Sequence, residues 1–277
     1  MIKTSYLALF ALFLTASFQA IPPTDNTPLP TTHFQPGERL TYKVHYGLVA
    51  AGLVHMSVDQ ALHTINEHNC YKIDVHGESQ GLLYVFLKMK NSFTSYVDTH
   101  QLIPHLFCRE IQEGTYRKYE KVTFDHLKQQ AHVAEFDPSF TTVTKQETFT
   151  TLPQVQDIVS QWYTFRNIDF RKLQAGDMLY SPVFFDNILH PHFATKFVGR
   201  RKLKTKFGHV KTIVVAPIIP IHSSANTIFA NENAVELFLS DDANKLPLKI
   251  KVNLIMGAVE LDLIEYAGTK TPLAILK

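Results

Sequence analysis

The sequence predicts a mainly β protein: a duplicated antiparallel sheet that forms an open half-barrel or a sandwich, with one central helix against it. Three observations support this fold class. Much of the chain alternates apolar and polar residues with the period of two that is typical of strands. One segment, Val155–Arg166, instead places apolar residues at helical spacing and ends in a cation. The glycine and proline pattern before this segment recurs after it, which indicates that the sheet is built twice.

The composition allows a sizeable core and does not indicate a nucleic-acid-binding protein. The chain has 277 residues, 45% of them hydrophobic, and its twenty Phe and eleven Tyr favour strands. The formal charge of +2 provides no general attraction to nucleic acid. Any electrostatic partner, such as an anionic component of the cell envelope, must therefore bind a local patch.

Residues 1–20 have the features of a signal peptide. Lys3 precedes an apolar run, Tyr6–Leu14, that is too short to span a bilayer. We expect cleavage near Ala20 and an exported protein, periplasmic or secreted, with no transmembrane segment in the mature chain; an uncleaved anchor is the alternative. No cysteine precedes Cys70, so a lipid-modified N-terminal cysteine is not expected. Residues 21–36 contain five prolines and are expected to be a linker.

A single β domain is expected over residues 37–266. In its first part, alternation predicts strands at Arg39–Tyr46, Leu53–Asp59, Tyr71–His76, Thr94–Asp98, His105–Gln112 and Tyr116–Asp125. Two further strands, Ala131–Phe136 and Phe140–Thr151, precede the helix, and strands resume after Gly176. Leu82–Leu87 is apolar on both faces, which is typical of a doubly buried strand or a short helix in the core. The alternative is a flap over an apolar cavity.

The evidence for duplication is a match of the chain with itself. Gly37 is followed 34 residues later by Tyr71–Val75, and Gly176 is followed 34 residues later by Val210–Val214. Ser95–Asp98 leads to Pro104 and then Gly114, as Leu239–Asp242 leads to Pro247 and then Gly257. We therefore expect repeats at 37–125 and 176–266, joined by a helix-containing connection at 126–175, with a tail at 267–277. Chance recurrence of turn residues is the alternative.

Several short motifs, taken in order, resemble a known family. They are Phe34–Tyr42, Ala50–Gly52, Val97-Asp98 leading to Pro104, Ile111–Gly114, Asp157–Ser160 with Arg166, and Leu239–Asp242 leading to Pro247. Together they resemble a family of exported bacterial proteins known only as domain of unknown function 3108, a name that implies no activity. Gln161-Trp162 and His190-Pro191-His192 depart from its pattern. In layout alone, the repeat is also similar to the half-barrels of LolA-like periplasmic lipid and lipoprotein carriers.

No catalytic or cofactor motif is present, so we expect neither an enzyme nor a cofactor. The sequence has no nucleophile elbow, phosphate-binding loop, HExxH or Cys-x-x-Cys. His190 and His192 with Asp186 could begin a zinc site, but Pro191 favours a loop, and no metal site is predicted. Asp241 and Asp242 are expected to bond local amides in a turn. An unrecognised hydrolase is the weakest of the functional alternatives.

Two features concern structure as much as function. Cys70 and Cys108 could form a disulfide in an oxidising compartment, or remain two buried thiols. Arg200, Lys202, Lys204 and Lys206 alternate along one strand and would form a basic surface patch. Such a row suits anionic headgroups or polymers of the envelope, but it also protects an edge strand from aggregation, which we favour.

The function that the sequence favours is binding of a lipid-like or other hydrophobic ligand in the half-barrel. The surplus of aromatic residues, the apolar Leu82–Leu87 and the missing catalytic motifs support this hypothesis. The candidate ligand-binding residues are Trp162 and Phe165 from the helix and Tyr84 and Phe86 from the flap. The main alternative is a structural or assembly partner in the envelope that has no small ligand and docks through the basic strand.

Overall fold

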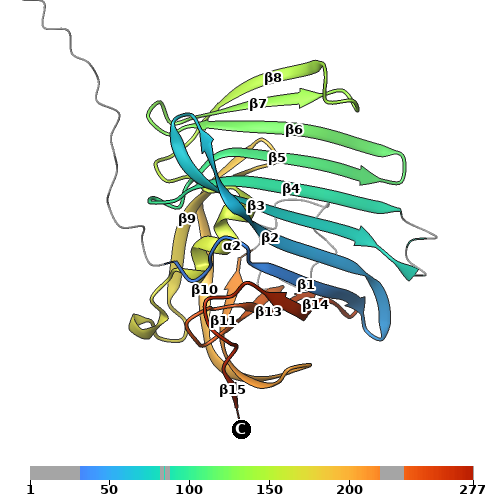
Figure 1. Cartoon of the computed structure of the whole chain (residues 1–277), viewed down its shortest axis with the longest axis vertical. Helices are drawn as coiled ribbons and strands as arrows, with labels where there is room; N and C mark the ends of the chain where they lie inside the picture. The colour runs from blue at the N-terminus through green and yellow to red at the C-terminus, as the bar shows by residue number, and fades with distance from the viewer. Residues whose placement is uncertain (1–31, 82–83, 85–87, 219–233, 277) are drawn as a thin grey trace, which may run out of the picture.

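The computed structural model describes residues 32–81, 84, 88–218 and 234–276. In this part of the chain, fifteen strands form one antiparallel sheet, and α-helix α2 packs against it (Figure 1). The open, mainly β architecture confirms the predicted fold class. None of the described helices is both long and apolar enough to span a bilayer.

The strands follow the predicted alternation, and most are longer than expected. Before the helix they are β1 (Arg39–Tyr46), β2 (Val49–Ile65), β3 (His68–Ser79), β4 (Met89–Asp98), β5 (Pro104–Glu113), β6 (Tyr116–Asp125), β7 (Gln130–Phe136) and β8 (Val143–Thr150). Helix α2 (Ile158–Arg166) and a 3-10 turn, η1 (Phe170–Lys172), come next. The remaining strands are β9 (Met178–Phe185), β10 (Ile188–Thr205), β11 (Gly208–Pro217), β12 (Val235–Ser240), β13 (Pro247–Asn253), β14 (Ala258–Ala267) and β15 (Ile275–Leu276).

Nearly every strand pairs with its neighbours in sequence, and one pairing joins the two halves. The order is β8-β7-β6-β5-β4-β3-β2-β1-β14-β13-β12-β11-β10-β9, with β15 beside β11. Strands β1 and β14 therefore form a seam in which Arg39 lies opposite Ala267 and Tyr46 opposite Val259. Residues 37–125 and 176–266 each supply six consecutive antiparallel strands, β1–β6 and β9–β14. That the two sets arose by duplication stays a prediction.

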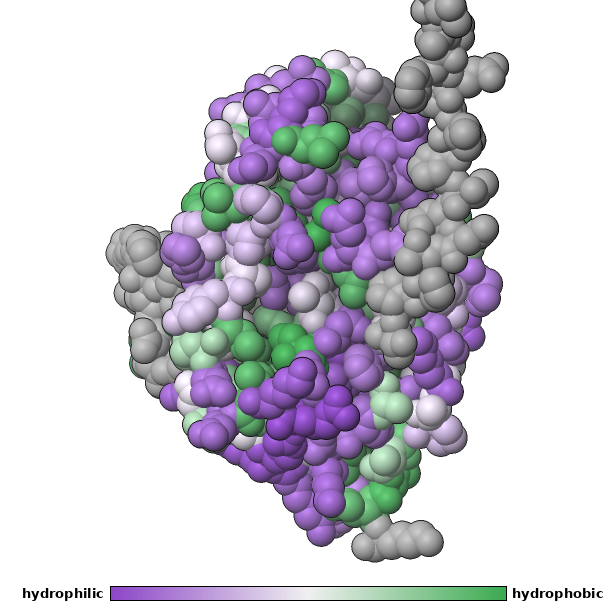
Figure 2. All heavy atoms as spheres, turned by 90° about the vertical axis from the view of Figure 1, so that its left-hand side faces the viewer, coloured by the Kyte–Doolittle hydropathy of each residue, from purple (hydrophilic) through white to green (hydrophobic). Residues whose placement is uncertain are grey.

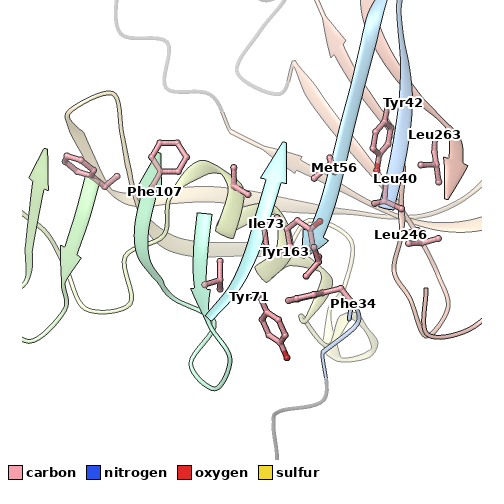
Figure 3. Close-up of a cluster of buried hydrophobic side chains, with 14 of the residues drawn as sticks. Phe34, Leu40, Tyr42, Met56, Tyr71, Ile73, Phe107, Tyr163, Leu246 and Leu263 are labelled. Carbon is pink, nitrogen blue, oxygen red and sulfur yellow. The ribbon is translucent and has the colours of Figure 1, made fainter. Parts of the chain in front are cut away.

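The sheet has an inner face, which contacts α2, and an outer face. The helix contacts β3 and β4 from the first half and β9 from the second, so the sheet curls around it. Alternate residues such as Tyr42, Ile73 and Phe107 are buried on the inner face with Tyr163 of the helix (Figure 3). Polar residues such as Lys43 and His76 occupy the outer face. Hydrophilic residues also predominate in the view of Figure 2, with hydrophobic residues in small groups between them.

The helix begins at Ile158, three residues later than the apolar periodicity predicts. Val155 and Gln156 instead precede the helix, and Gln156 exchanges backbone hydrogen bonds with Pro182 and Phe184 of β9. Asp157 is the N-cap: its carboxylate accepts the N–H of Val159 and Ser160 at 2.7 and 2.8 Å. Ser95 of β4 donates to the same carboxylate at 2.6 Å, so the cap also ties the helix to the sheet.

The far end of the helix is anchored by a buried ion pair. Arg166 binds both carboxylate oxygens of Glu38 at 2.6 and 2.8 Å, and each side chain is 1% exposed. The same guanidinium donates to the carbonyls of His33 and Asn244. The pair thus joins the entry to β1, the end of α2 and the loop between β12 and β13.

Both ends of the described chain are packed against the sheet or the core. Phe34, at the end of the proline-rich segment, is 1% exposed and contacts Tyr71 and Tyr163 edge-to-face. Leu273 is buried in the same cluster, and residues 275–276 pair with β11. The division into a linker at 21–36 and a tail at 267–277 stays a prediction.

Candidate functional site

The inner face carries apolar side chains from both halves that are only partly buried. They surround two buried clusters, and we call them the apolar inner wall: Val54, Val75, Phe93, Ile158, Trp162, Leu179, Leu189, Phe193, Ile250 and Leu261. Cross-strand pairing places them on one face, since Val54 lies opposite the buried Tyr42 and Val75 lies opposite both Met56 and Phe93. Seven strands and the helix contribute to this surface.

The predicted ligand residues occupy three different environments. Phe165 is 3% exposed and packs with Phe170 and Phe197, so it is a core residue. Trp162 is partly exposed, contacts Phe165 edge-to-face with ring centroids 6.0 Å apart, and belongs to the apolar inner wall. Tyr84 is half exposed, with the Lys88 ammonium 5.7 Å above its ring. Phe86, and with it most of the predicted flap, lies outside the described residues.

The basic strand is the second half of β10. The Arg200 side chain is held in place by hydrogen bonds to the Asp241 carboxylate at 3.1 Å and to the carbonyl of Phe170 at 3.0 Å. Lys202 and Lys204 are exposed on the strand, and Lys206 is exposed in the turn that follows. Strand β9 pairs with β10 only as far as Lys196. In the part of the chain that the structure describes, no strand pairs with that side of β10 beyond this point, so the lysines lie on an open edge.

The two cysteines are separate thiols. Cys70 lies on β3 opposite Asp98, and Cys108 lies on β5 opposite Thr94, with β4 between them. Two strand spacings alone separate the cysteine backbones by at least about 10 Å, too far for a disulfide, and their partners on β4 are also four residues apart. Burial raises the pKa of Cys70 to about 12 and also raises the pKa of Cys108. Both thiols are therefore protonated and poorly reactive.

Asp186 binds cations of the protein rather than forming a metal site with His190 and His192. Its carboxylate accepts from buried Arg109 at 2.6 Å, and this bond lowers the pKa of Asp186. Arg109 also binds Glu120 of β6 at 2.7 Å. The network joins the β9–β10 turn to the inner face of β5 and β6. The segment around Pro191 is part of strand β10 rather than the expected loop, because an irregularity between His190 and Phe193 accommodates the proline.

Of the two aspartates after β12, Asp242 has the local role that the sequence indicates, whereas Asp241 binds Arg200. Asp242 accepts the N–H of Asn244 and Lys245 at 3.0 and 3.1 Å. Asp98 makes the equivalent bonds after β4, to His100 and Gln101, both at 2.7 Å. These bonds close the connections that precede Pro247 and Pro104, where the next strands start.

The structure assembles one polar cluster that the sequence analysis missed. His68, Asp98 and His105 come from three neighbouring strands and meet at one end of the sheet. In a β-meander, the start of β3, the end of β4 and the start of β5 share one edge. Arranging the predicted strands as a meander would therefore have brought these three residues together.

One similar solved structure agrees with the fold. A crystal structure titled a β-barrel-like protein of domain of unknown function 1849, from Brucella abortus, is similar with a TM-score of 0.52 at 10% identity, covering 84% of this chain and 98% of that one. A candidate lipoprotein from Parabacteroides distasonis gives a TM-score of 0.34 at 10% identity, covering 86% and 99%. A search of curated proteins finds no match.

The family assignment rests on the sequence itself. A family model described as protein of unknown function (DUF3108) matches residues 41–264, which extend from β1 to β14. This match includes the helix cap at Asp157, the buried Arg166 and both aspartate turns. The chain therefore belongs to the DUF3108 family.

Proposed function

We propose that the protein is an exported, non-enzymatic protein of the cell envelope that holds a lipid-like or other hydrophobic ligand against the apolar inner wall. The observation that carries this proposal is the wall itself. It is a set of partly exposed apolar residues from both halves of the sheet and from the helix. An apolar surface of this kind is typical of a binding site, where hydrophobic lining residues supply most of the affinity.

The polar groups near the wall fit a binding role. Gln161 of α2 accepts a hydrogen bond from Ser181 of β9 at 2.8 Å, and Thr164 donates to Gln156 at 3.3 Å. These side chains hold the helix in place by bonds to one another. The sequence also contains no nucleophile elbow, phosphate-binding loop, HExxH or Cys-x-x-Cys, which favours binding over catalysis.

Trp162 makes the proposal directly testable, because it is the single tryptophan of the chain and belongs to the wall. We expect native mass spectrometry of protein purified from its own cell envelope to show a bound lipid. We also expect a brominated fatty acid to quench the Trp162 fluorescence at concentrations where the unbrominated acid does not. Protein that carries no ligand and shows no specific quenching would rule the carrier function out.

A matched pair of variants localises the binding. Val54→Asp places a charge in the wall, and its desolvation should weaken ligand binding about tenfold or more. Val49→Asp makes the same change on the same strand at a side chain that is 52% exposed, and it should bind like the wild type. Equal affinity in the two folded variants would place any ligand elsewhere.

A further inference from the structure

The cluster of His68, Asp98 and His105 has the geometry of a metal site. The Asp98 Oδ2 atom lies 3.2 Å from His68 Nδ1 and 3.4 Å from His105 Nε2. All three candidate ligand atoms lie within 4.8 Å of one another. Two ligands of a tetrahedral zinc ion, each bonded at about 2.0–2.1 Å, are roughly 3.3 Å apart. The observed spacing is therefore that of atoms able to share one ion.

The protein holds this carboxylate in position. The other oxygen of Asp98, Oδ1, accepts the backbone N–H groups of His100 and Gln101, both at 2.7 Å. These bonds fix the side chain and leave Oδ2 directed at the two imidazoles. Outer contacts of this kind orient the ligands of protein metal sites. The side chains of Asp98 and His105 are 5% and 7% exposed, whereas that of His68 is 47% exposed, so the cluster is open to solvent on one side.

Two further imidazoles line the cavity beside the cluster. The cluster lies on a surface cavity of about 590 Å³ that is also lined by His126 and His132. His126 contacts His105 edge-to-face, with ring centroids 5.4 Å apart. Its Nε2 bonds the Pro104 carbonyl at 2.7 Å, which leaves Nδ1 as the acceptor. That atom is buried and, among the described residues, has no hydrogen-bond partner.

A second group with similar composition does not share these properties. His45, Glu260 and Asp262 also meet, on the outer face of β1 and β14. There, however, the Lys249 ammonium binds Glu260 at 2.6 Å and Asp262 at 3.1 Å. A cation of the protein already neutralises these carboxylates, which disfavours a metal ion.

We propose that His68, Asp98 and His105 bind one divalent transition-metal ion of the zinc class, with its remaining positions open to the cavity. Two imidazoles and a carboxylate form a ligand set that suits Zn²⁺ and its neighbours in the first transition row. The ion would bridge β3, β4 and β5 at the end of the sheet. This site lies apart from the apolar inner wall and does not depend on the proposed ligand.

Zinc itself is the probe, added to the full chain after removal of any polyhistidine tag and followed by isothermal titration calorimetry. We expect one ion per chain. His68→Ala removes the most exposed ligand and should weaken zinc binding at least about tenfold. The matched control is His63→Ala: His63 bonds the Asp59 carboxylate at 2.8 Å on β2, without a second imidazole. This control should bind zinc like the wild type.

Every outcome decides the proposal. The site is supported if the folded His68→Ala variant loses zinc binding and the control variants keep it. X-ray absorption spectroscopy of the zinc-bound protein should then show only nitrogen and oxygen ligands. Absence of stoichiometric zinc binding, or unchanged binding in His68→Ala, overturns it. Loss of binding in His45→Ala instead would also overturn it and assign the ion to the group on β1 and β14.

Discussion

Arg166 joins the helix to two segments that lie far from it in the chain. It bonds Glu38, His33 and Asn244 while being 1% exposed. We expect Arg166→Met to lower the free energy of unfolding by about 3–5 kcal/mol, because it leaves the Glu38 carboxylate buried without a partner. Urea denaturation followed by circular dichroism measures this change.

The control for Arg166 is the same substitution in an exposed pair. Arg171 binds Asp169 at 2.8 Å in η1, but its side chain is 87% exposed. Arg171→Met should leave the unfolding free energy nearly unchanged, because water replaces the lost partner. Equal losses in both variants would show that the buried pair does not anchor the helix.

Asp157 should make stability depend on pH. Burial raises the pKa of this carboxyl to about 6, above its ordinary value of 3.8, although the bonds from Ser95 and the helix N–H groups lower it. Because the folded-state pKa lies above the unfolded value, the protonated carboxyl adds to the free energy of unfolding. This contribution is complete below about pH 4 and is lost as the pH rises through 6. The loss reaches about 3 kcal/mol, at roughly 1.4 kcal/mol for each pH unit between the two pKa values.

The comparison with Asp157→Asn isolates this effect from other titrating groups. The asparagine keeps an acceptor for the helix N–H groups but does not titrate. We therefore expect the stability of the variant relative to the wild type to rise between pH 4 and pH 7. A stability difference that is flat over this range, measured by urea denaturation at each pH, would contradict a raised pKa for Asp157.

Residue spacing alone revealed some site residues and concealed others. The turn role of Asp242 follows from local sequence, because its Oδ1 accepts N–H groups two and three residues ahead. Its bond from Ala274 and the bond of Asp241 with Arg200 depend on the fold. The separation of Cys70 from Cys108 could not be predicted without the strand order, since β4 lies between them. His68, Asp98 and His105 are up to 37 residues apart in the chain. They meet because the pairing of β3, β4 and β5 brings these strand ends together.

The open edge of strand β10 allows a test of whether its lysines prevent association of the chains. The lysines at 202 and 204 lie where its edge is open, and an unprotected edge pairs with other chains. We expect Lys202→Val with Lys204→Val to cause concentration-dependent association, measured by light scattering. Lys202→Glu with Lys204→Glu should stay monomeric, because either sign of charge protects an edge.

A matched control uses lysines on strands that are paired on both sides. Lys43 lies between Leu53 and Asp262, and Lys121 lies between Cys108 and Ala134. Lys43→Val with Lys121→Val should therefore remain monomeric. If the glutamate variant lost an envelope partner while remaining monomeric, the sign of the charge would matter, and the strand would be a docking surface.

The limits of periodicity are clearest in helix α2. Apolar spacing located the helix and its C-terminal Arg166, but it included Val155, which is buried although it lies outside the helix, next to the bridge between Gln156 and β9. Periodicity records which side chains are buried and not which backbone bonds they make. The acidic N-cap followed by Ser160 was the better local signal, because a capping pair of this kind marks the first turn.

At the scale of the whole molecule, alternation was sufficient to predict an open β architecture, since one face of each strand had to be covered. It predicted β1 and β6 with their observed bounds. The pairing of β1 with β14 could not be predicted, because nothing in a single strand specifies a partner more than two hundred residues away. Equivalent strands in the two halves share hairpin order, and superposition of their backbones is the test of the duplication.

The seam between β1 and β14 constrains how this chain can be made. During synthesis β1 emerges from the ribosome early, and its partner β14 emerges only after nearly all the other strands. Until then β1 is an edge strand whose unpaired backbone N–H and C=O groups can bond to another polypeptide. A chaperone that covers this edge of β1 would therefore protect the incomplete chain. The slowest folding step should be the pairing of β1 with β14, because these strands are far apart in the sequence.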